Sequence, residues 1–167
     1  ANQTAADNLD AGDVVTDSFN YTVSDGTATD IAVITITVIG INDAPTAQDD
    51  EGVIVEGSTL TVANSANANV SGSYDATGEH SGDVIDTSSS SHTDSDADAS
   101  ASLSITHIKL SGGSNSTVAS SSSYNSNGTQ IVGTYGTLTI GADGSYTYAA
   151  TTAAADALDT GEEGTDT

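Results

Sequence analysis

Apolar and polar residues alternate over short stretches of this chain, and a period of two is typical of β-strands. Phe19, Tyr21 and Val23 share one parity, and a long β-branched run follows at Ile31–Gly40. The segment between them, SDGTATD, is rich in turn-forming residues. We therefore predict two strands, 19–23 and 31–39, and the second has apolar residues on both faces.

Shorter strand patterns follow the only proline, Pro45, at VIV (53–55) and TLTV (59–62). In SLSITHIKL (102–110) the apolar residues change parity, which predicts a strand with a β-bulge near Thr106 and His107.

The stretch GTLTIGADGSYTYA (136–149) predicts a hairpin, because Asp143 and Gly144 can supply the positive φ of a tight turn. Two polar stretches, 63–101 and 111–128, lack periodicity and indicate irregular serine-rich loops. No segment has a convincing helical period. Short alternating strands joined by turns predict an all-β fold, a Greek-key β-sandwich.

The two ends of the chain resemble each other. Without a gap, Ala1 aligns with Ala150, Asp10 with Asp159 and Asp17 with Asp166, a constant offset of 149 residues. A sustained match of this kind indicates one structural period plus a short overlap. We expect the chain to be a window from a longer tandem array.

Charge narrows the function classes. The chain has 24 acidic residues and one basic residue, Lys109, which gives a net charge of −23 and excludes nucleic acid and anionic membranes as partners. Aspartate predominates among the acids, and its hard oxygen atoms suit loops that hold cations. The alternative is a solvated acidic surface, as in halophiles, with no bound ion. The chain has no Cys, which excludes thiol chemistry, and no apolar run approaches the length of a membrane span.

Several blocks, in order, resemble the VCBS and related bacterial cadherin-like repeats of giant secreted (RTX-type) adhesins: TDSFNYTVSDG, ITVIGINDAP, DDEGVIVEG, TDSDAD and GTYGTLTIGADGSYTYA. The resemblance implies an immunoglobulin/cadherin-like sandwich in tandem on the cell surface, exported unfolded by a type I secretion route. The resemblance also indicates where one repeat ends and the next begins in this chain. Residues 1–43 are expected to be the closing strands of one repeat, and 44–167 most of the next repeat without its own closing strands.

The resemblance also implies calcium at the ends of the domains. Its acid pair falls near Asp10 and Asp13, its linker ligands on Asn42 and Asp43, and its Asp-x-Asp motif on Asp94 and Asp96, extended by Asp98. The remaining two candidates are Asp25, which would complete the site of its own domain, and Glu56, which would lie near Asp159 and Glu162. The linker departs from the family pattern at two ligand positions, so we expect fewer or weaker ions. Each candidate could instead be a plain turn or loop residue.

These expectations favour a structural extender that performs no reaction and assembles head-to-tail with neighbouring copies. A glycan- or surface-binding module acting through the serine-rich loops is the alternative, which a glycan array would distinguish. The three histidines lack metal-ligand spacing, and the many serines make a catalytic triad uninformative. Lys109 could form an isopeptide bond with an asparagine, as in some pilins, but a solvent-facing lysine on a strand is favoured.

Overall fold

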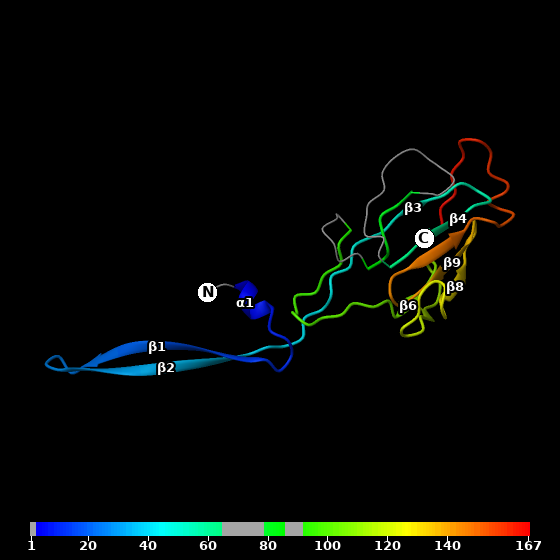
Figure 1. Ribbon diagram of the computed structural model, residues 1–167. Helices are drawn as coiled ribbons and strands as arrows, with labels where there is room; N and C mark the ends of the chain where they lie inside the picture. The colour runs from blue at the N-terminus through cyan, green and yellow to red at the C-terminus, as the bar shows by residue number, and fades with distance from the viewer. Residues whose placement is uncertain (1–2, 65–78, 86–91) are drawn as a thin grey trace. The chain divides into compact units, whose positions relative to one another are not determined.

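The computed structural model describes residues 3–64, 79–85 and 92–167 (Figure 1). Much of the polar stretch predicted at 63–101 lies outside these residues. The described elements, in chain order, are α1 (Gln3–Asp7), β1 (Val14–Ser24), β2 (Thr29–Ile39), β3 (Gly52–Val53), β4 (Thr59–Val62), β5 (Glu79–His80), β6 (His107–Ile108), β7 (Ser116–Thr117), β8 (Thr129–Val132), β9 (Thr137–Ile140) and β10 (Tyr146–Ala149). All strand pairs are antiparallel, so the all-β class is confirmed.

The chain divides into two compact units. The first comprises Ala1–Pro45 with Asp96–Ser102, and the second comprises Thr46–Ser95 with Leu103–Thr167. The predicted division at residues 43 and 44 came from the phase of the repeat, and the assignment of each part to a different repeat stays a prediction. What the sequence did not indicate is that a segment from the middle of the chain, 96–102, belongs with the N-terminal part.

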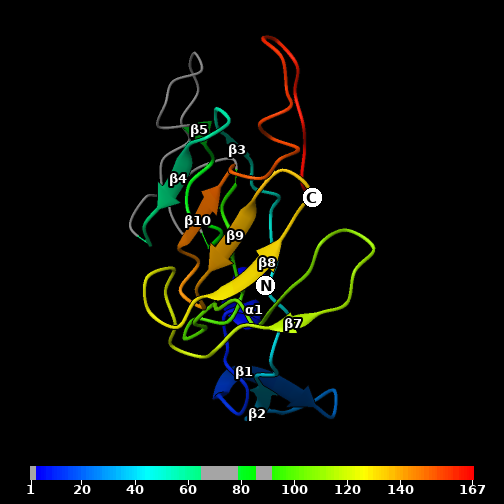
Figure 2. The same cartoon turned by 90° about the vertical axis from the view of Figure 1, so that its right-hand side faces the viewer.

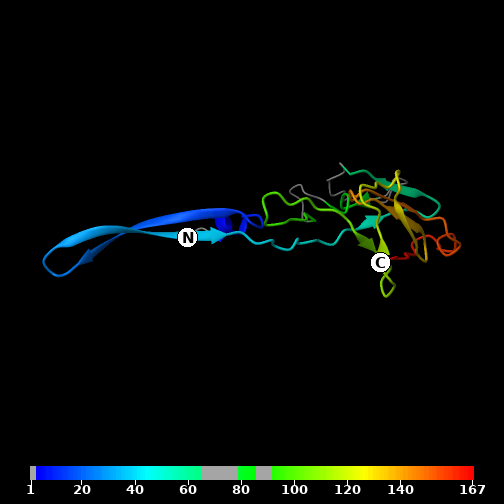
Figure 3. The same ribbon diagram turned by 90° about the horizontal axis from the view of Figure 1, so that it is seen from below.

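The first unit is built around the long hairpin of β1 and β2, which pair along their whole length (Figure 3). Residues directly opposite each other in an antiparallel pair lie on the same face. Phe19 faces Ile34 and Tyr21 faces Ala32, whereas Asn20 faces Val33 and Ser18 faces Thr35. One face of the hairpin is therefore almost entirely apolar. Its members are Val15, Phe19, Tyr21, Val23, Ala32, Ile34, Ile36 and Val38, together with Asp17 and Asp30.

This apolar face is open to solvent. Phe19 is 56% exposed, Ile34 47% and Ile36 46%. The two strands form a two-stranded sheet of their own. β1 is longer than predicted, because it begins at Val14 rather than at Phe19.

The second unit contains a four-stranded antiparallel sheet in the order β4-β10-β9-β8 (Figure 2). Its register aligns rows of side chains across the strands. Val62, Tyr146 and Ile140 form one row. Leu60, Tyr148, Leu138 and Ile131 form the next. In β4, Leu60 and Val62 are buried while Thr59 and Thr61 are exposed, which is the alternation expected of a strand with one covered face.

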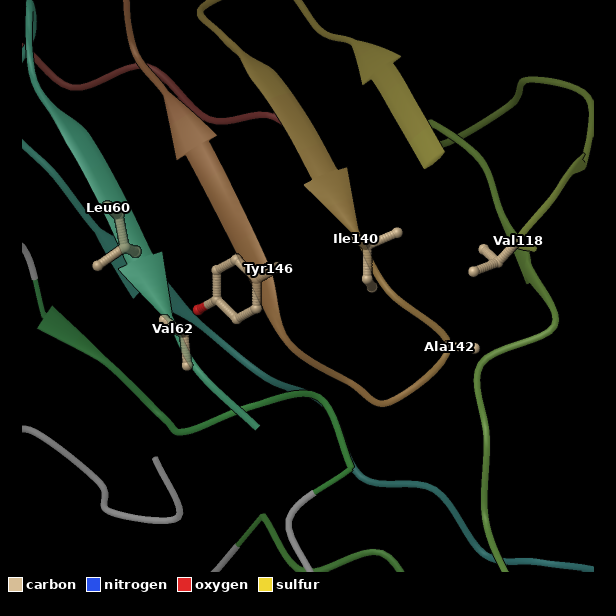
Figure 4. Packing of buried hydrophobic residues seen from close by; sticks show 6 residues of the cluster. All are labelled: Leu60, Val62, Val118, Ile140, Ala142 and Tyr146. Carbon is tan, nitrogen blue, oxygen red and sulfur yellow. The ribbon is translucent and has the colours of Figure 1, made fainter. Parts of the chain in front are cut away.

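The core of this unit is small. Figure 4 shows its buried cluster, in which the Tyr146 ring lies between the side chains of β4 and Ile140 of β9. Its members are Leu60, Val62, Val118, Ile140, Ala142 and Tyr146. Ile105 and Ile108 are partly buried against it. The segment 103–110 thus contributes to the core, although only two of its residues form a β-ladder.

Other sequence predictions have mixed outcomes. The hairpin of β9 and β10 is confirmed, and Gly144 in its turn has φ of 86°. The strand predicted over 102–110 is reduced to β6, and the strand predicted at 53–55 is shifted to β3. The short helix α1 was not predicted. No helix in the described parts of the chain is long and apolar enough to cross a membrane.

Candidate functional site

Several sequence-predicted ligands lie in the first unit, where backbone hydrogen bonds join three segments of the chain. The turn Asp10–Asp13 is closed by the Asp13 N–H donating to Asp10 O (2.9 Å) and the Asp10 N–H donating to Asp13 Oδ2 (3.3 Å). Gly40, at the end of β2, joins this turn, because its N–H donates to Asp13 O (2.9 Å) and its carbonyl accepts from Gly12 N–H (3.2 Å). The acid pair and the linker are thereby held side by side.

Gly40 is required for this approach. A Cβ atom at this position would overlap Asp10 O and would lie 2.8 Å from Leu9 Cβ. No side chain larger than hydrogen fits there without a backbone shift. The glycine therefore fixes how closely the acidic turn can approach residues 40–43.

The third segment, 96–100, adds its own carboxylates. Asp43 N–H donates to Asp98 Oδ2 (2.9 Å), and Asp98 N–H donates to Asp96 Oδ1 (2.9 Å). Ser100 N–H donates to Asp10 Oδ1 (3.1 Å), and hydrogen bonding from Ser100 holds the pKa of the Asp10 carboxyl below its usual value. Asp10, Asp43, Asp96 and Asp98 are thus parts of one network, the acidic network of this unit.

One oxygen of the acidic network stands apart. Asp98 Oδ1 is buried and has no hydrogen-bond partner among the described residues. A buried carboxylate oxygen without a donor is costly, and a cation would satisfy it. The oxygen donors nearby are of the hard type that Ca²⁺ prefers. However, no three or more His, Cys, Asp or Glu side chains in the described residues are already grouped as a metal site, so binding would require carboxylates to turn toward the ion.

The remaining candidates are placed elsewhere. Asp94 belongs to the second unit, where it is buried and its Oδ1 accepts from Gln48 N–H (2.8 Å). Asn42 uses its side-chain amide to donate to Asp43 O. Glu56 is exposed in the turn before β4.

Asp25 lies in the turn at the far end of the hairpin from Gly40. Its Oδ1 accepts from Thr27 N–H and Ala28 N–H (both 2.8 Å), and these bonds, Ala28 first, lower the pKa of its carboxyl. Eleven-residue strands at about 3.3 Å per residue separate it from Gly40 by roughly 35 Å, so it cannot share an ion with the acidic network.

The 149-residue offset has a structural counterpart. Leu9 N–H donates to Ala6 O (3.3 Å), and Leu158 N–H donates to Ala155 O (3.0 Å). The turn of Asp10 recurs at Asp159, whose N–H donates to Glu162 Oε2 (2.9 Å). The third position of each turn is a glycine with φ near 90°, at Gly12 and Gly161. Segments 6–13 and 155–162 therefore share sequence and local conformation.

Just after the second of these segments, the carboxylate of Asp166 fills a cradle of donors that sequence reasoning missed. The backbone N–H groups of Thr134, Tyr135 and Gly136 donate to it (2.7, 3.0 and 3.2 Å), and the Tyr148 hydroxyl donates to its Oδ2 (2.5 Å). Asp166 was visible in the sequence only as the counterpart of Asp17, which in this chain lies exposed on β1.

Comparisons with known proteins add no family to this description. No family model, no curated protein and no solved structure matches the chain.

Proposed function

We propose that the chain is a structural extender repeat of an extracellular bacterial adhesin or surface fibre, built as an immunoglobulin-like Greek-key sandwich and stiffened by calcium. The observation that carries this proposal is the recurrence of sequence and conformation between segments 6–13 and 155–162. A chain that begins a second period with the same turn has the organisation of a tandem array, in which each repeat contacts its neighbours.

The acidic network supports the calcium part of the proposal. It ties residues from three distant parts of the sequence, and Asp98 Oδ1 in it is buried without a donor among the described residues. An ion held by Asp10, Asp43, Asp96 and Asp98 would neutralise mutual repulsion and fix these segments together. The chain's net charge of −23 makes that repulsion large when no cation is bound.

The role is mechanical and involves no reaction. A row of repeats joined head-to-tail would hold a distal binding region away from the cell surface. Export before folding, followed by folding in a calcium-rich exterior, is consistent with a chain that has no cysteine.

Calcium-dependent unfolding tests the proposal. Thermal unfolding of the chain in chelator, in millimolar CaCl₂ and in MgCl₂ should show the highest Tm with calcium, because a ligand at about 100 times its Kd stabilises the folded state by about 2.7 kcal/mol. Magnesium should do less, because it sheds water reluctantly. Equal Tm values in chelator and in calcium would contradict the proposal that the chain is stiffened by calcium.

Matched variants localise the effect. Asp96→Asn with Asp98→Asn should remove most of the calcium response, since both carboxylates belong to the acidic network. Asp30→Asn, at the other end of the hairpin, should leave it intact. Asp94→Asn should lower Tm equally with and without calcium, because Asp94 supports Gln48 in the second unit. A calcium response lost only in Asp94→Asn would assign the calcium site to Asp94 in the second unit and not to the acidic network.

A further inference from the structure

The hairpin β1–β2 presents an apolar face that its own two-stranded sheet does not cover. The offset of 149 residues makes Asp166 the counterpart of Asp17 and Thr167 the counterpart of Ser18. Ser18 is followed at once by Phe19, Asn20 and Tyr21 of β1. The path of Thr167 in the second unit therefore indicates where strand β1 of the next period would start.

Thr167 meets the segment that leads to the core. The Ser111 N–H donates to Thr167 O (2.6 Å), directly after Asp166 is fixed in its cradle. Beyond Ser111 the chain turns away, with Gly113 N–H donating to Leu110 O and Gly112 at φ of 76°. A strand continuing from Thr167 can therefore remain paired only by running antiparallel, back along Leu110 toward Thr106.

The length of this stretch matches the strand. At its other end the backbone is engaged, because Ile105 N–H donates to Ala142 O (3.0 Å). Five residues, Thr106–Leu110, remain between the two contacts. The neighbouring chain on the other side of this stretch is β7, which pairs with β6 and whose following residue Val118 donates to Thr106 O (2.9 Å).

The antiparallel register that starts from Thr167 and Ser111 pairs apolar residues with apolar residues and polar residues with polar residues. With Thr167 opposite Ser111, Phe19 of the next copy lies opposite Leu110, Asn20 opposite Lys109 and Tyr21 opposite Ile108. Directly opposed residues share a face. Leu110 and Ile108 are half-buried, and Ile108 packs on the core, so they meet the two aromatic residues of the hairpin's apolar face. Exposed Lys109 meets polar Asn20.

Charge favours the same match. Lys109 is the only basic side chain in a chain of net charge −23, and it lies within this five-residue stretch. The hairpin has only two acidic residues in its 22 strand positions, Asp17 and Asp30. Contact here avoids the repulsion that most pairs of surfaces on two such acidic chains would suffer.

We infer that Thr106–Leu110 is the seat for strand β1 of a second copy of this chain, with Phe19 opposite Leu110 and Tyr21 opposite Ile108. The inference rests on the proposed tandem organisation and specifies its contact. The hairpin adds as a pair of strands, so its apolar face continues the half-buried face formed by Ile108 and Leu110. The donor's residues before Ser18 are not needed, because the acceptor's own residues 150–166 already lie in that position.

Cysteine pairs test the register in the full chain, which has no native cysteine. The variant Asn20→Cys with Lys109→Cys should give dimers and larger disulfide-linked species under oxidising conditions, since directly opposed residues come within bonding distance. The matched pair Thr16→Cys with Lys109→Cys uses the same face of the hairpin four residues away and should not cross-link above background. Equal cross-linking of both pairs, or a cross-linked monomer alone, would overturn the inference.

A second pair of variants tests the apolar face by sedimentation velocity. Ile34→Asp lies on that face, and Thr35→Asp lies next to it on the opposite face. Concentration-dependent association should be lost in the first and kept in the second. Association that survives Ile34→Asp would overturn the inference.

The seat and the proposed function fail separately. Suppose that the parent chain responds to calcium but the Asn20→Cys, Lys109→Cys variant forms no disulfide-linked oligomers. The proposed function then stands, and only the contact at Thr106–Leu110 is contradicted. If that variant forms disulfide-linked oligomers and the parent chain shows no calcium response, the contact stands and the calcium part of the proposed function is contradicted.

Discussion

Four donors converge on the Asp166 carboxylate, and their effect on ionisation can be stated with its sign. Burial raises the pKa of Asp166, but the Tyr148 hydroxyl and the backbone N–H groups of Thr134, Tyr135 and Gly136 outweigh it, so the pKa lies below its usual value. Burial and the neighbouring carboxylate raise the pKa of Tyr148. The pair is therefore ionised Asp and neutral Tyr throughout the neutral range.

Replacing Asp166 by Asn should cost stability at neutral pH and not in acid. Because the folded-state pKa is lowered, the stabilisation is present above the ordinary carboxyl pKa and is lost as pH falls through the folded value. We expect Asp166→Asn to lower the free energy of unfolding by about 2 kcal/mol at pH 7, the scale for losing hydrogen bonds to a charged group. Urea unfolding at a series of pH values from 7 down to 2 measures this difference. The exposed Asp156→Asn is the control, and a penalty that does not shrink as the pH falls below the ordinary carboxyl pKa would contradict the assignment.

The motifs of the sequence selected single residues, but not their role. The Asp-x-Asp motif was placed on Asp94 and Asp96 and extended by Asp98, and the NDAP block supplied Asn42 and Asp43; that these residues bind an ion stays a prediction. The hydrogen bond from Asp43 to Asp98 spans 55 positions, and no local pattern encodes such a contact. The family resemblance grouped Asp94 with Asp96, yet the two residues belong to different units.

At the scale of elements, turn chemistry was the most reliable signal. The β9–β10 turn follows from Asp143-Gly144, since only glycine adopts positive φ without strain. The β1–β2 hairpin follows from the alternation before SDGTATD and from the β-branched run after it. Strand β8 was missed because TQIV offers only two apolar residues beside a serine-rich stretch. The strand predicted over 102–110 is mostly unpaired, since strand pairing depends on neighbours that a sequence pattern does not include.

Two glycines of similar backbone conformation separate the contributions of strain and packing. Gly144 and Gly112 both have positive φ, 86° and 76°. A Cβ at Gly144 would lie 3.0 Å from Ile85 N and 3.1 Å from its side chain, whereas a Cβ at Gly112 meets nothing within 4 Å. Gly112→Ala should cost about 1 kcal/mol through φ alone, and Gly144→Ala should cost roughly 1–3 kcal/mol more through crowding. Chemical denaturation measures both, and equal losses would contradict the close contact.

At the scale of the whole molecule, the net charge has the largest expected effect on folding stability. A net charge of −23 on 167 residues destabilises the folded state through self-repulsion when screening is weak. We expect the free energy of unfolding to rise between about 0.01 M and 0.5 M NaCl, as the Debye length falls from about 30 Å to well below 10 Å. Choline chloride should act equally if screening alone is responsible. A flat response to both salts would show that the acidic side chains are too dispersed to repel.

The sequence predicts the acidity of the whole molecule and its repeat, because composition and self-similarity are properties of the sequence and do not depend on how the chain folds. It does not predict that segment 96–102 joins the first unit. That grouping depends on hydrogen bonds from residues 43 and 100 to carboxylates far along the chain. Long-range backbone contacts of this type leave no periodic trace in the sequence.

The exposed hairpin and its seat lie on different parts of the same chain, so an assembly built through them is polar. One end of the filament always presents a hairpin whose apolar face is uncovered. The other end always presents a Thr106–Leu110 stretch with no strand paired to it from a second copy. The Ile34→Asp chain keeps the Thr106–Leu110 stretch but loses the apolar face of its hairpin, which makes it a terminator of growth at one end only. Added in small amounts, it should shorten filaments without dissolving them, and its location by labelling would distinguish the leading end of a fibre from the trailing end.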